Sequence, residues 1–412
     1  MSGKQAVQSH REAEESSEQG ADALEQKSRF QRGQKLQAGG GHGGAGVTAR
    51  VALATRKGGI GAAVAAGLVA GCPERKLEVL CALRADDAEA IRVLLDQLPI
   101  EIYEIDSDSP FEIDLHGRTN AHEVRVHLVN RHTNITDVIR DSEDLTPRYR
   151  LNEAATETYA ADRALLNVKD IVTFADEVPL DDIAPLLRRQ IDMNMAIARE
   201  GLTESYGASI GRIIYADGTC ILRDRARAYA AAGSDARMNG CELPVCIISG
   251  SGNQGITASV PVVVYAEAMG ADEEQLLRAL IVSDLITIHQ KTGIGCLSAY
   301  CGAISAGCGC GTGICYLKGG KYYEIAHSLV NSLAILSGTI CDGAKASCAA
   351  KIAMAVEAGI MGYDMMRSGR QFYGGDGIIT KGVENTIRNI GRLAREGMSE
   401  TDREIIRIML GE

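Results

Sequence analysis

Three cysteines in the glycine-rich second half of the chain are the residues best suited to chemistry. Cys301 stands alone in LSAYCGAISAG, and Cys341 and Cys348 follow together in TICDGAKASCAAK. Neither segment has the Cys-x-x-Cys pairs typical of a structural zinc site. Three thiolates could instead hold a cubane iron–sulfur cluster and leave one iron open as a Lewis acid. The alternative is that these cysteines only pack, as buried cysteines usually do.

The spacing of Cys341 and Cys348 predicts a break in the chain between them. On an unbroken helix the two would share a face but stand about 10 Å apart along the axis, too far for one small cluster. An Asp-Gly pair between them is a turn signal. We therefore expect a loop over residues 341–345 and a new helix from about residue 345, with Cys348 in its first turn. The positive end of that helix would favour an anionic cluster.

A glycine-rich segment, ISGSGNQGITASV, lies upstream between two apolar runs. Its backbone N–H groups and amide side chains can form a cradle for a substrate carboxylate. It lacks the Gly-Lys-Ser/Thr of a phosphate loop and the strand–helix unit of a dinucleotide site. A simple turn between helices is the alternative interpretation.

These segments together resemble the L-cysteine desulfidase family, the UPF0597-type proteins related to the alpha-subunit domain of iron–sulfur L-serine dehydratases. The resemblance runs from about residue 58 to the C-terminus. It also takes in HTNI (132–135), YLKGG (316–320) and TIRNIGRLAREGM (386–398). Because several specific motifs occur in the expected order, the match is strong.

The resemblance implies β-elimination from a small L-amino acid, with L-cysteine giving pyruvate, ammonia and sulfide. It also implies a [4Fe-4S] cluster and no pyridoxal phosphate. By analogy with the dehydratases, the metal ligands fall on Cys301, Cys341 and Cys348. The substrate-binding residues would be Ser251, Gly252, Asn253, Gln254, Gly255, His132 and Asn134. For a histidine near a strand turn, however, a structural role is the commoner one.

The start of the chain departs from the family pattern. Members usually begin with a Gly-Cys-Thr-Glu-Pro motif whose cysteine the family places at the active site, and nothing in residues 1–57 matches it. The general base, and with it any catalytic residue, therefore stays unassigned. We expect residues 1–57 to be a disordered tail. Either a catalytic element is lost, or this segment is translated in the wrong frame, which we favour because the pattern resumes abruptly at GGIGAAVAAGLVAG.

Two alternatives to a cysteine desulfidase stay open. L-serine could be the substrate, or the chain could be an inactive cluster-binding paralogue that lacks the N-terminal motif.

Asp342 could accept a hydrogen bond from the substrate ammonium or cap the next helix. Lys345 and Lys351 could steady negative charge or be solvated, and for Lys351 we expect solvation. The cysteines that we expect only to pack are Cys296, Cys308, Cys310 and Cys315.

Composition limits the classes of partner and compartment. A net charge of −11 and a pI near 5.4 argue against a nucleic-acid surface. Twelve cysteines at irregular spacing, without a signal peptide, indicate a reducing cytoplasm. No apolar run reaches the roughly 20 residues of a membrane helix. We expect a cytoplasmic enzyme with a small amino-acid substrate and no nucleic-acid or membrane partner, and leave open a homo-oligomer.

Hydrophobic periodicity predicts an α+β fold in two domains. A small α/β domain with antiparallel strands would cover residues 58–145. A larger, mostly helical domain like the serine dehydratase alpha subunit would cover 146–412 and carry the cysteine site. The predicted strands are 76–83, 100–106, 111–119 and the alternating segment 122–141. The predicted helices include 58–71, 86–98, 179–201 ending at Gly201, 272–291, 321–338 and 401–410.

Overall fold

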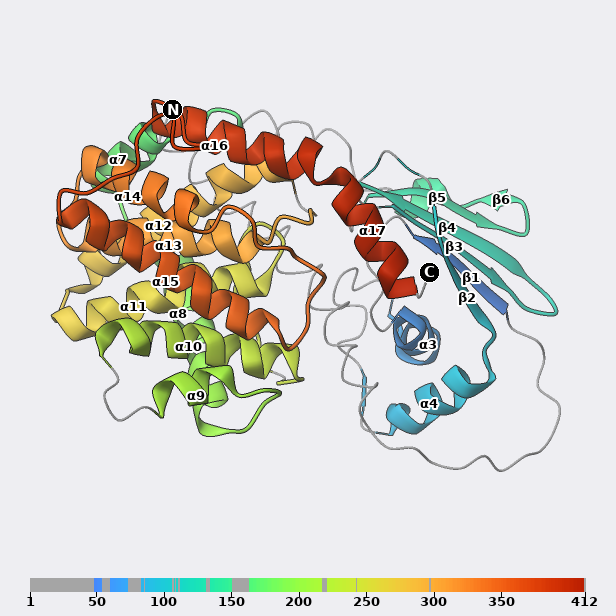
Figure 1. Cartoon of the computed structure of the whole chain (residues 1–412). Coiled ribbons are helices and arrows are strands. Elements are labelled where there is room, and N and C mark those ends of the chain that lie inside the picture. Colours follow the sequence, from blue (N-terminus) through green and yellow to red (C-terminus); the bar gives the residue numbers. More distant parts are fainter. Residues whose placement is uncertain are drawn as a thin grey trace. The chain divides into compact units, whose positions relative to one another are not determined.

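The computed structural model describes residues 48–53, 60–72, 83–84, 86–105, 107, 109, 112–130, 134–149, 163–216, 221–241, 243–295 and 298–410. These residues fall into two compact units. A helical unit ends at Ser399, and a sheet unit comprises the described residues before Ala155 together with those from Glu400 onward. The α+β class, with a small sheet region followed by helices, is confirmed (Figure 1).

The sheet unit contains a six-stranded sheet in the described part of the chain, with the order β2-β1-β3-β4-β5-β6. The first two strands pair parallel, and all the other neighbours are antiparallel. The strands are β1 (Thr48–Leu53), β2 (Ile100–Glu104), β3 (Glu112–Arg118), β4 (Glu123–Val129), β5 (Ile135–Arg140) and β6 (Glu143–Asp144). Alternating apolar and polar residues form β3 and β4, as strands with one polar face require.

Two helices precede the antiparallel strands, and two further helices belong to the same unit. Helices α3 (Ile60–Ala70) and α4 (Asp87–Gln97) share a small apolar cluster centred on Ala65, Ala66 and Ile91. The short α5 (Thr146–Tyr149) packs on β5, and α17 (Ser399–Leu410) groups with this unit rather than with the helical one.

One boundary differs from that expected. Thr48–Leu53 forms β1, so the N-terminal tail does not extend to residue 57. Its alternation of Thr48, Arg50 and Ala52 with Ala49, Val51 and Leu53 is short, which makes a strand hard to recognise from sequence. The expected strand at 76–83 lies almost entirely outside the described residues, as does most of the tail.

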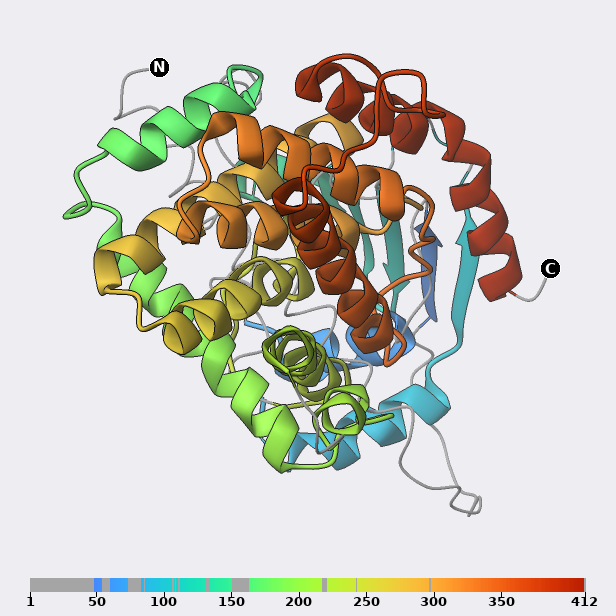
Figure 2. The same cartoon turned by 60° about the vertical axis from the view of Figure 1, so that its left-hand side comes forward.

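The helical unit is built from ten α-helices in its described part, and Figure 2 shows them packed closely around one another. They are α7 (Val168–Glu177), α8 (Ala184–Thr203), α9 (Ile210–Tyr215), α10 (Leu222–Met238), α11 (Gly252–Met269), α12 (Glu273–Ile294), α13 (Gly302–Leu317), α14 (Tyr322–Ile335), α15 (Cys348–Arg367) and α16 (Val383–Arg392). A π-helical turn, η3 (Leu393–Gly397), follows. The helices predicted at 272–291, 321–338 and 401–410 are confirmed as α12, α14 and α17.

Helix α13 lies at the centre of this unit and packs against α11, α12, α14 and α15. Its backbone approaches that of α15 very closely. A Cβ atom on Gly307 would lie 2.3 Å from Ala355 O, and one on Gly359 would lie 2.1 Å from Gly307 O. Residues without a side chain are therefore needed where the two helices touch. This contact fixes the start of α13 relative to the start of α15.

Gly201 has a different role from the one expected. It lies inside α8, which continues to Thr203, and does not end the helix. A Cβ atom on Gly201 would lie 2.0 Å from Ala232 O of α10. The glycine therefore permits close helix packing, and the helix end is set by the residues that follow it. The preference of glycine for helix ends misled the sequence interpretation here.

Candidate functional site

A short backbone pairing brings Cys301 to Cys341. The residues just before α13 run antiparallel to those just before Cys341. Cys301 N donates to Thr339 O at 3.1 Å, and Cys341 N donates to Ala299 O at 2.7 Å. The two thiols share a hydrogen bond. A contact between two segments about 40 residues apart in the chain thus places these thiols side by side.

Cys348 is the first residue of α15. Lys345 N donates to the Cys348 sulfur at 3.4 Å, and the Cys348 thiol donates to Gly343 O at 3.7 Å. Gly343 has φ 96°, a left-handed conformation that suits the predicted Asp-Gly turn. The loop is present and Cys348 lies in the first turn. The helix begins at residue 348, three residues later than expected.

The three thiols influence one another electrostatically. The pKa of Cys301 is raised far above its ordinary value, first by the hydrogen bond with Cys341 and next by burial, and Cys348 adds to the rise. Cys301 is 6% exposed, whereas Cys341 and Cys348 are partly exposed. The structure therefore brings together the three predicted ligands at the starts of α13 and α15.

The donors at this site are of the type that an iron–sulfur cluster binds. Among the described residues, no group of three or more His, Cys, Asp or Glu side chains is placed to hold one metal ion. Each cysteine of a cubane binds a different iron, so its sulfurs need not converge on one point. Three soft thiols, of which Cys301 and Cys348 lie at helix N-termini, match the soft, anionic character of such a cluster.

Lys351 holds the turn that carries Cys341. Its Nζ donates to Asp342 Oδ1 at 2.5 Å and to Ile340 O at 2.9 Å, and Lys345 Nζ lies 3.3 Å from the other Asp342 oxygen. Burial alone would raise the pKa of Asp342, but the hydrogen bond and charge of Lys351 lower it below its ordinary value. The expectation that Lys351 is simply solvated was wrong, because its side chain reaches back from α15 to this turn.

The predicted substrate loop is half turn and half helix. Ser249 and Gly250 adopt φ values of 49° and 84°, and Ile248 and Ser251 exchange backbone hydrogen bonds across them. From Gly252 onward the chain is already α11, with Ser251 as its N-cap. The segment was expected to be a loop because glycine disfavours helices. Burial in the interior overrides that preference here, and residues 252–255 form the first turn.

The first turn of α11 carries amide side chains with unsatisfied oxygens. Asn253 is 7% exposed and Gln254 is 6% exposed. Within the described part of the chain, their side-chain carbonyl oxygens have no hydrogen-bond partner. A Cβ atom on Gly302 would lie 2.6 Å from Gln254 Cδ, so this amide lies against the residue after Cys301. Gln254 thereby links the start of α11 to the cysteine site.

An arginine that the sequence interpretation missed lies at the same helix start. Arg237, near the end of α10, is 8% exposed. A Cβ atom on Gly252 would lie 2.4 Å from Arg237 Nε, so the guanidinium packs directly on the first residue of α11. The available signal in the sequence is an arginine within the alanine-rich run AYAAAGSDARM, which also contains Asp235.

Of the HTNI residues, the structure describes Asn134 and Ile135, which belong to the sheet unit. His132 lies outside the described residues. Asn134 Nδ2 donates to Val129 O at 2.8 Å and Val129 N donates to Asn134 O at 3.2 Å, so Asn134 closes the connection between β4 and β5. Its substrate role stays a prediction.

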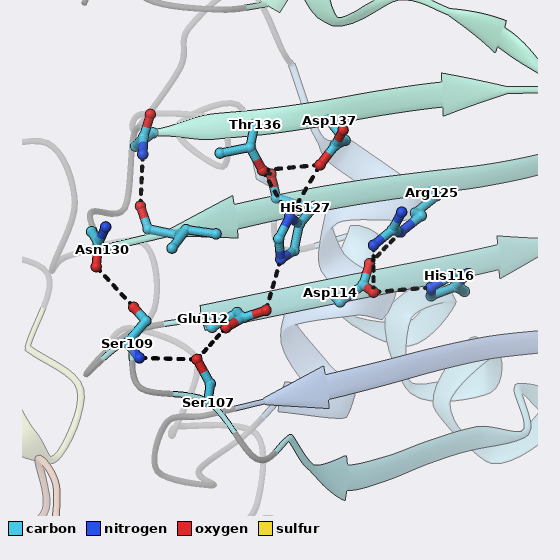
Figure 3. A network of polar contacts seen from close by, with 12 residues as sticks. Ser107, Ser109, Glu112, Asp114, His116, Arg125, His127, Asn130, Thr136 and Asp137 are labelled. Carbon is cyan, nitrogen blue, oxygen red and sulfur yellow. Dashed lines mark hydrogen bonds and ion pairs between the residues drawn. The ribbon is translucent and has the colours of Figure 1, made fainter.

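The polar face of the sheet carries a separate network (Figure 3). His127 Nε2 contacts Glu112 Oε1 at 2.9 Å, and its Nδ1 contacts Asp137 Oδ2 at 3.1 Å and Thr136 Oγ1 at 2.8 Å. Both ring nitrogens are therefore engaged within the sheet. The network ties β3, β4 and β5 together and occupies both nitrogens of His127.

Comparison with known proteins shows the family of this chain. The chain matches the serine dehydratase alpha chain family model over residues 74–407, which places it among proteins with that domain. It belongs to the UPF0597 family, and the expected resemblance is confirmed.

Three relatives illustrate the match. The chain is 50% identical over 354 residues, 86% of this chain and 82% of the relative, to a UPF0597 protein of Desulfitobacterium hafniense. It is 43% identical over 355 residues, 85% of this chain and 84% of the relative, to one of Lachnoclostridium phytofermentans. It is 41% identical over 358 residues, 85% of this chain and 83% of the relative, to one of Treponema denticola. Among the described helices, none is long and apolar enough to cross a bilayer.

Proposed function

We propose that the protein is an iron–sulfur dependent lyase that eliminates the β-substituent of a small L-amino acid, with L-cysteine giving pyruvate, ammonia and sulfide. The observation that carries the proposal is the gathering of three thiols from separate segments at the starts of α13 and α15. The serine dehydratase alpha chain domain supports the same class of reaction.

Cys301, Cys341 and Cys348 would hold a [4Fe-4S] cluster. When bound, that group supplies an open iron, a Lewis acid that polarises the β-thiol or β-hydroxyl as a leaving group. The other residues position these ligands. The pairing of residues 299–301 with 339–341 sets one thiol beside another, and Lys351 fixes the turn between the second and third.

The first turn of α11 would orient the substrate beside this site. Gln254 touches Gly302, the neighbour of Cys301, so a molecule bound at the start of α11 would lie close to the thiols. Elimination moves the α-proton to a base and releases sulfide with its bonding electron pair. The resulting enamine takes up water and gives pyruvate and ammonia. No described side chain identifies the base.

The test compares pyruvate release from L-cysteine and L-serine by anaerobically reconstituted protein. We expect pyruvate with an equal amount of sulfide from L-cysteine, at a kcat/KM at least about tenfold above that for L-serine. The C301S protein, treated identically, is the matched control and should release neither product.

L-serine is the second candidate substrate, because the domain that matches this chain is named for serine dehydratase. A higher kcat/KM for L-serine, with pyruvate but no sulfide, would replace the desulfidase proposal by a dehydratase. A fully loaded cluster without pyruvate from either amino acid would instead identify a cluster-binding paralogue without lyase activity.

A further inference from the structure

We infer that Arg237 and the first turn of α11 form a recognition site for both charged groups of an α-amino acid. Arg237 would bind the α-carboxylate, and the side-chain oxygens of Asn253 and Gln254 would bind the α-ammonium. The inference rests on the proposed function for the reaction and goes beyond it by assigning a role to each group of the substrate. It draws on two independent observations.

The first observation is the positive potential at the start of α11. Helix α11 is 18 residues long, and the N–H groups of its first turn point out of its N-terminus. The guanidinium of Arg237 packs on Gly252, the first residue of that turn. A fork of guanidinium donors beside backbone N–H groups matches the geometry of a carboxylate.

The second observation is a set of buried acceptors that the described protein leaves unsatisfied. Asn253 Oδ1, Gln254 Oε1 and Ser249 Oγ lack a hydrogen-bond partner in the described part of the chain, and each residue is less than 9% exposed. A buried carbonyl without a donor costs free energy. An ammonium has three donors and no acceptor capacity, so it satisfies such oxygens.

The two observations together specify the ligand. A carboxylate alone would bind Arg237 and the backbone N–H groups but leave the amide oxygens unsatisfied. An amine alone would satisfy the amide oxygens but bring no anion to Arg237. An α-amino acid satisfies both within one small molecule. Because Gln254 lies against Gly302, the β-substituent of a molecule held this way would be directed toward Cys301.

Gly252 is part of this arrangement. A Cβ atom at this position would lie 2.4 Å from Arg237 Nε and 2.5 Å from Val245 Cγ2. Any side chain at residue 252 would therefore displace the guanidinium. Gly252 is thus the first residue of α11 and also permits the close approach of the Arg237 guanidinium.

The test measures binding of L-alanine, an α-amino acid without a β-leaving group, by calorimetry on the full-length protein with and without reconstituted cluster. Propionate lacks the ammonium, and ethylamine lacks the carboxylate. We expect L-alanine to bind at least about tenfold more tightly than either. Equal binding of L-alanine and propionate, or no binding of L-alanine, would overturn the inference.

Two variants separate recognition from folding. Gln254→Leu removes the unsatisfied oxygen but keeps the size, so its thermal stability should equal or exceed that of the wild type, while L-alanine binding falls at least about tenfold. Arg237→Lys keeps the charge but loses the fork and should weaken binding less than Arg237→Gln. Arg199→Gln, an exposed position on α8, is the matched charge control. Wild-type binding by Q254L and R237Q would overturn the inference.

Failure of the lyase proposal and failure of this inference give different results. If L-alanine binding depends on Arg237 and Gln254 but neither L-cysteine nor L-serine yields pyruvate, the site stands and the lyase proposal falls. If pyruvate forms and R237Q and Q254L retain the wild-type KM and kcat, the lyase stands and the assignment of these residues falls.

Discussion

Cys301, at the start of α13, and Cys308 and Cys310, inside the same helix, are all buried but have different surroundings. At the start of α13, the pKa of Cys301 is raised first by a thiol from another segment. Inside the same helix, burial alone raises the pKa of Cys308 and is the main cause of the rise at Cys310. The expectation that these two only pack agrees with their complete burial. Burial is therefore common to all three cysteines, whereas a hydrogen bond with a thiol from another segment distinguishes Cys301.

The largest expected effect tests that difference directly. Replacing Cys301, Cys341 or Cys348 singly by Ser should remove most of the iron and sulfide, and with them the brown colour, from anaerobically reconstituted protein. A hard hydroxyl is a poor substitute for a soft thiolate. Iron and sulfide analysis with the visible absorption spectrum measures the loss. Cys308→Ala is the matched control and should stay brown. A full iron content in the three Ser variants would show that Cys301, Cys341 and Cys348 are not cluster ligands.

The second prediction concerns the contact that fixes the two helix starts. Gly307→Ala places a methyl group 2.3 Å from Ala355 O, so α13 and α15 must separate. We expect a loss of about 1–3 kcal/mol in the free energy of unfolding, measured by urea denaturation. Gly338→Ala, with nothing within 4 Å of the added atom, should change stability by less than about 0.5 kcal/mol. Equal stability of the two variants would show that the helices do not need this close approach.

A smaller effect is expected at Lys351. Lys351→Met removes the bonds to Ile340 O and Asp342, so the turn carrying Cys341 should be held less firmly. We expect a loss of about 1–2 kcal/mol in unfolding free energy and faster loss of iron to a chelator. Lys345→Met removes one partly exposed ion pair and should cost less than about 1 kcal/mol. Identical iron loss from the two variants would contradict a positioning role for Lys351.

The smallest expected effect concerns Asp235, a carboxyl group whose pKa is raised mainly by burial. Burial raises the pKa of Asp235 to about 6, although N–H groups of Gly211 and Ile210 partly oppose the rise. Its folded pKa lies above the unfolded value, so its stabilising contribution is fully present below about pH 4 and is lost as the pH rises through 6. Asp235→Asn should therefore gain about 1 kcal/mol over the wild type between pH 5 and 7.

Thermal unfolding of the two proteins across that pH range provides the measurement. Carboxylates common to both proteins cancel in the difference, which isolates Asp235. A difference that stays constant between pH 5 and 7 would show that this carboxyl titrates normally in the folded protein.

The amphipathic elements could be predicted from the sequence, and the long-range contacts could not. Period-two alternation identified β3, β4 and β5, and the 3.6-residue period identified α4, α12 and α17. The turn before Cys348 followed from a local Asp-Gly signal. The pairing of residues 299–301 with 339–341 has no local signal, because backbone hydrogen bonds carry no side-chain pattern.

Buried residues account for the remaining differences. The first turn of α11 was interpreted as a loop because its glycines are poor helix formers, yet every residue from Gly252 to Gly255 is buried. Arg237 was overlooked because charged side chains, of which α10 has several, are usually exposed to solvent. In both cases the tertiary surroundings, which a periodicity analysis does not contain, decide the outcome.

The backbone contact between Gly307 and Gly359 limits how far the starts of α13 and α15 can move apart. Helices in backbone contact shift together, so Cys301 and Cys348, at their two starts, keep a nearly constant separation. Cys341 sits on a short segment held by two peptide hydrogen bonds and one lysine. If a cluster bound by the three sulfurs needed more room, we expect the segment that bears Cys341 to move, because the contact of Gly307 with Gly359 holds the two helices together.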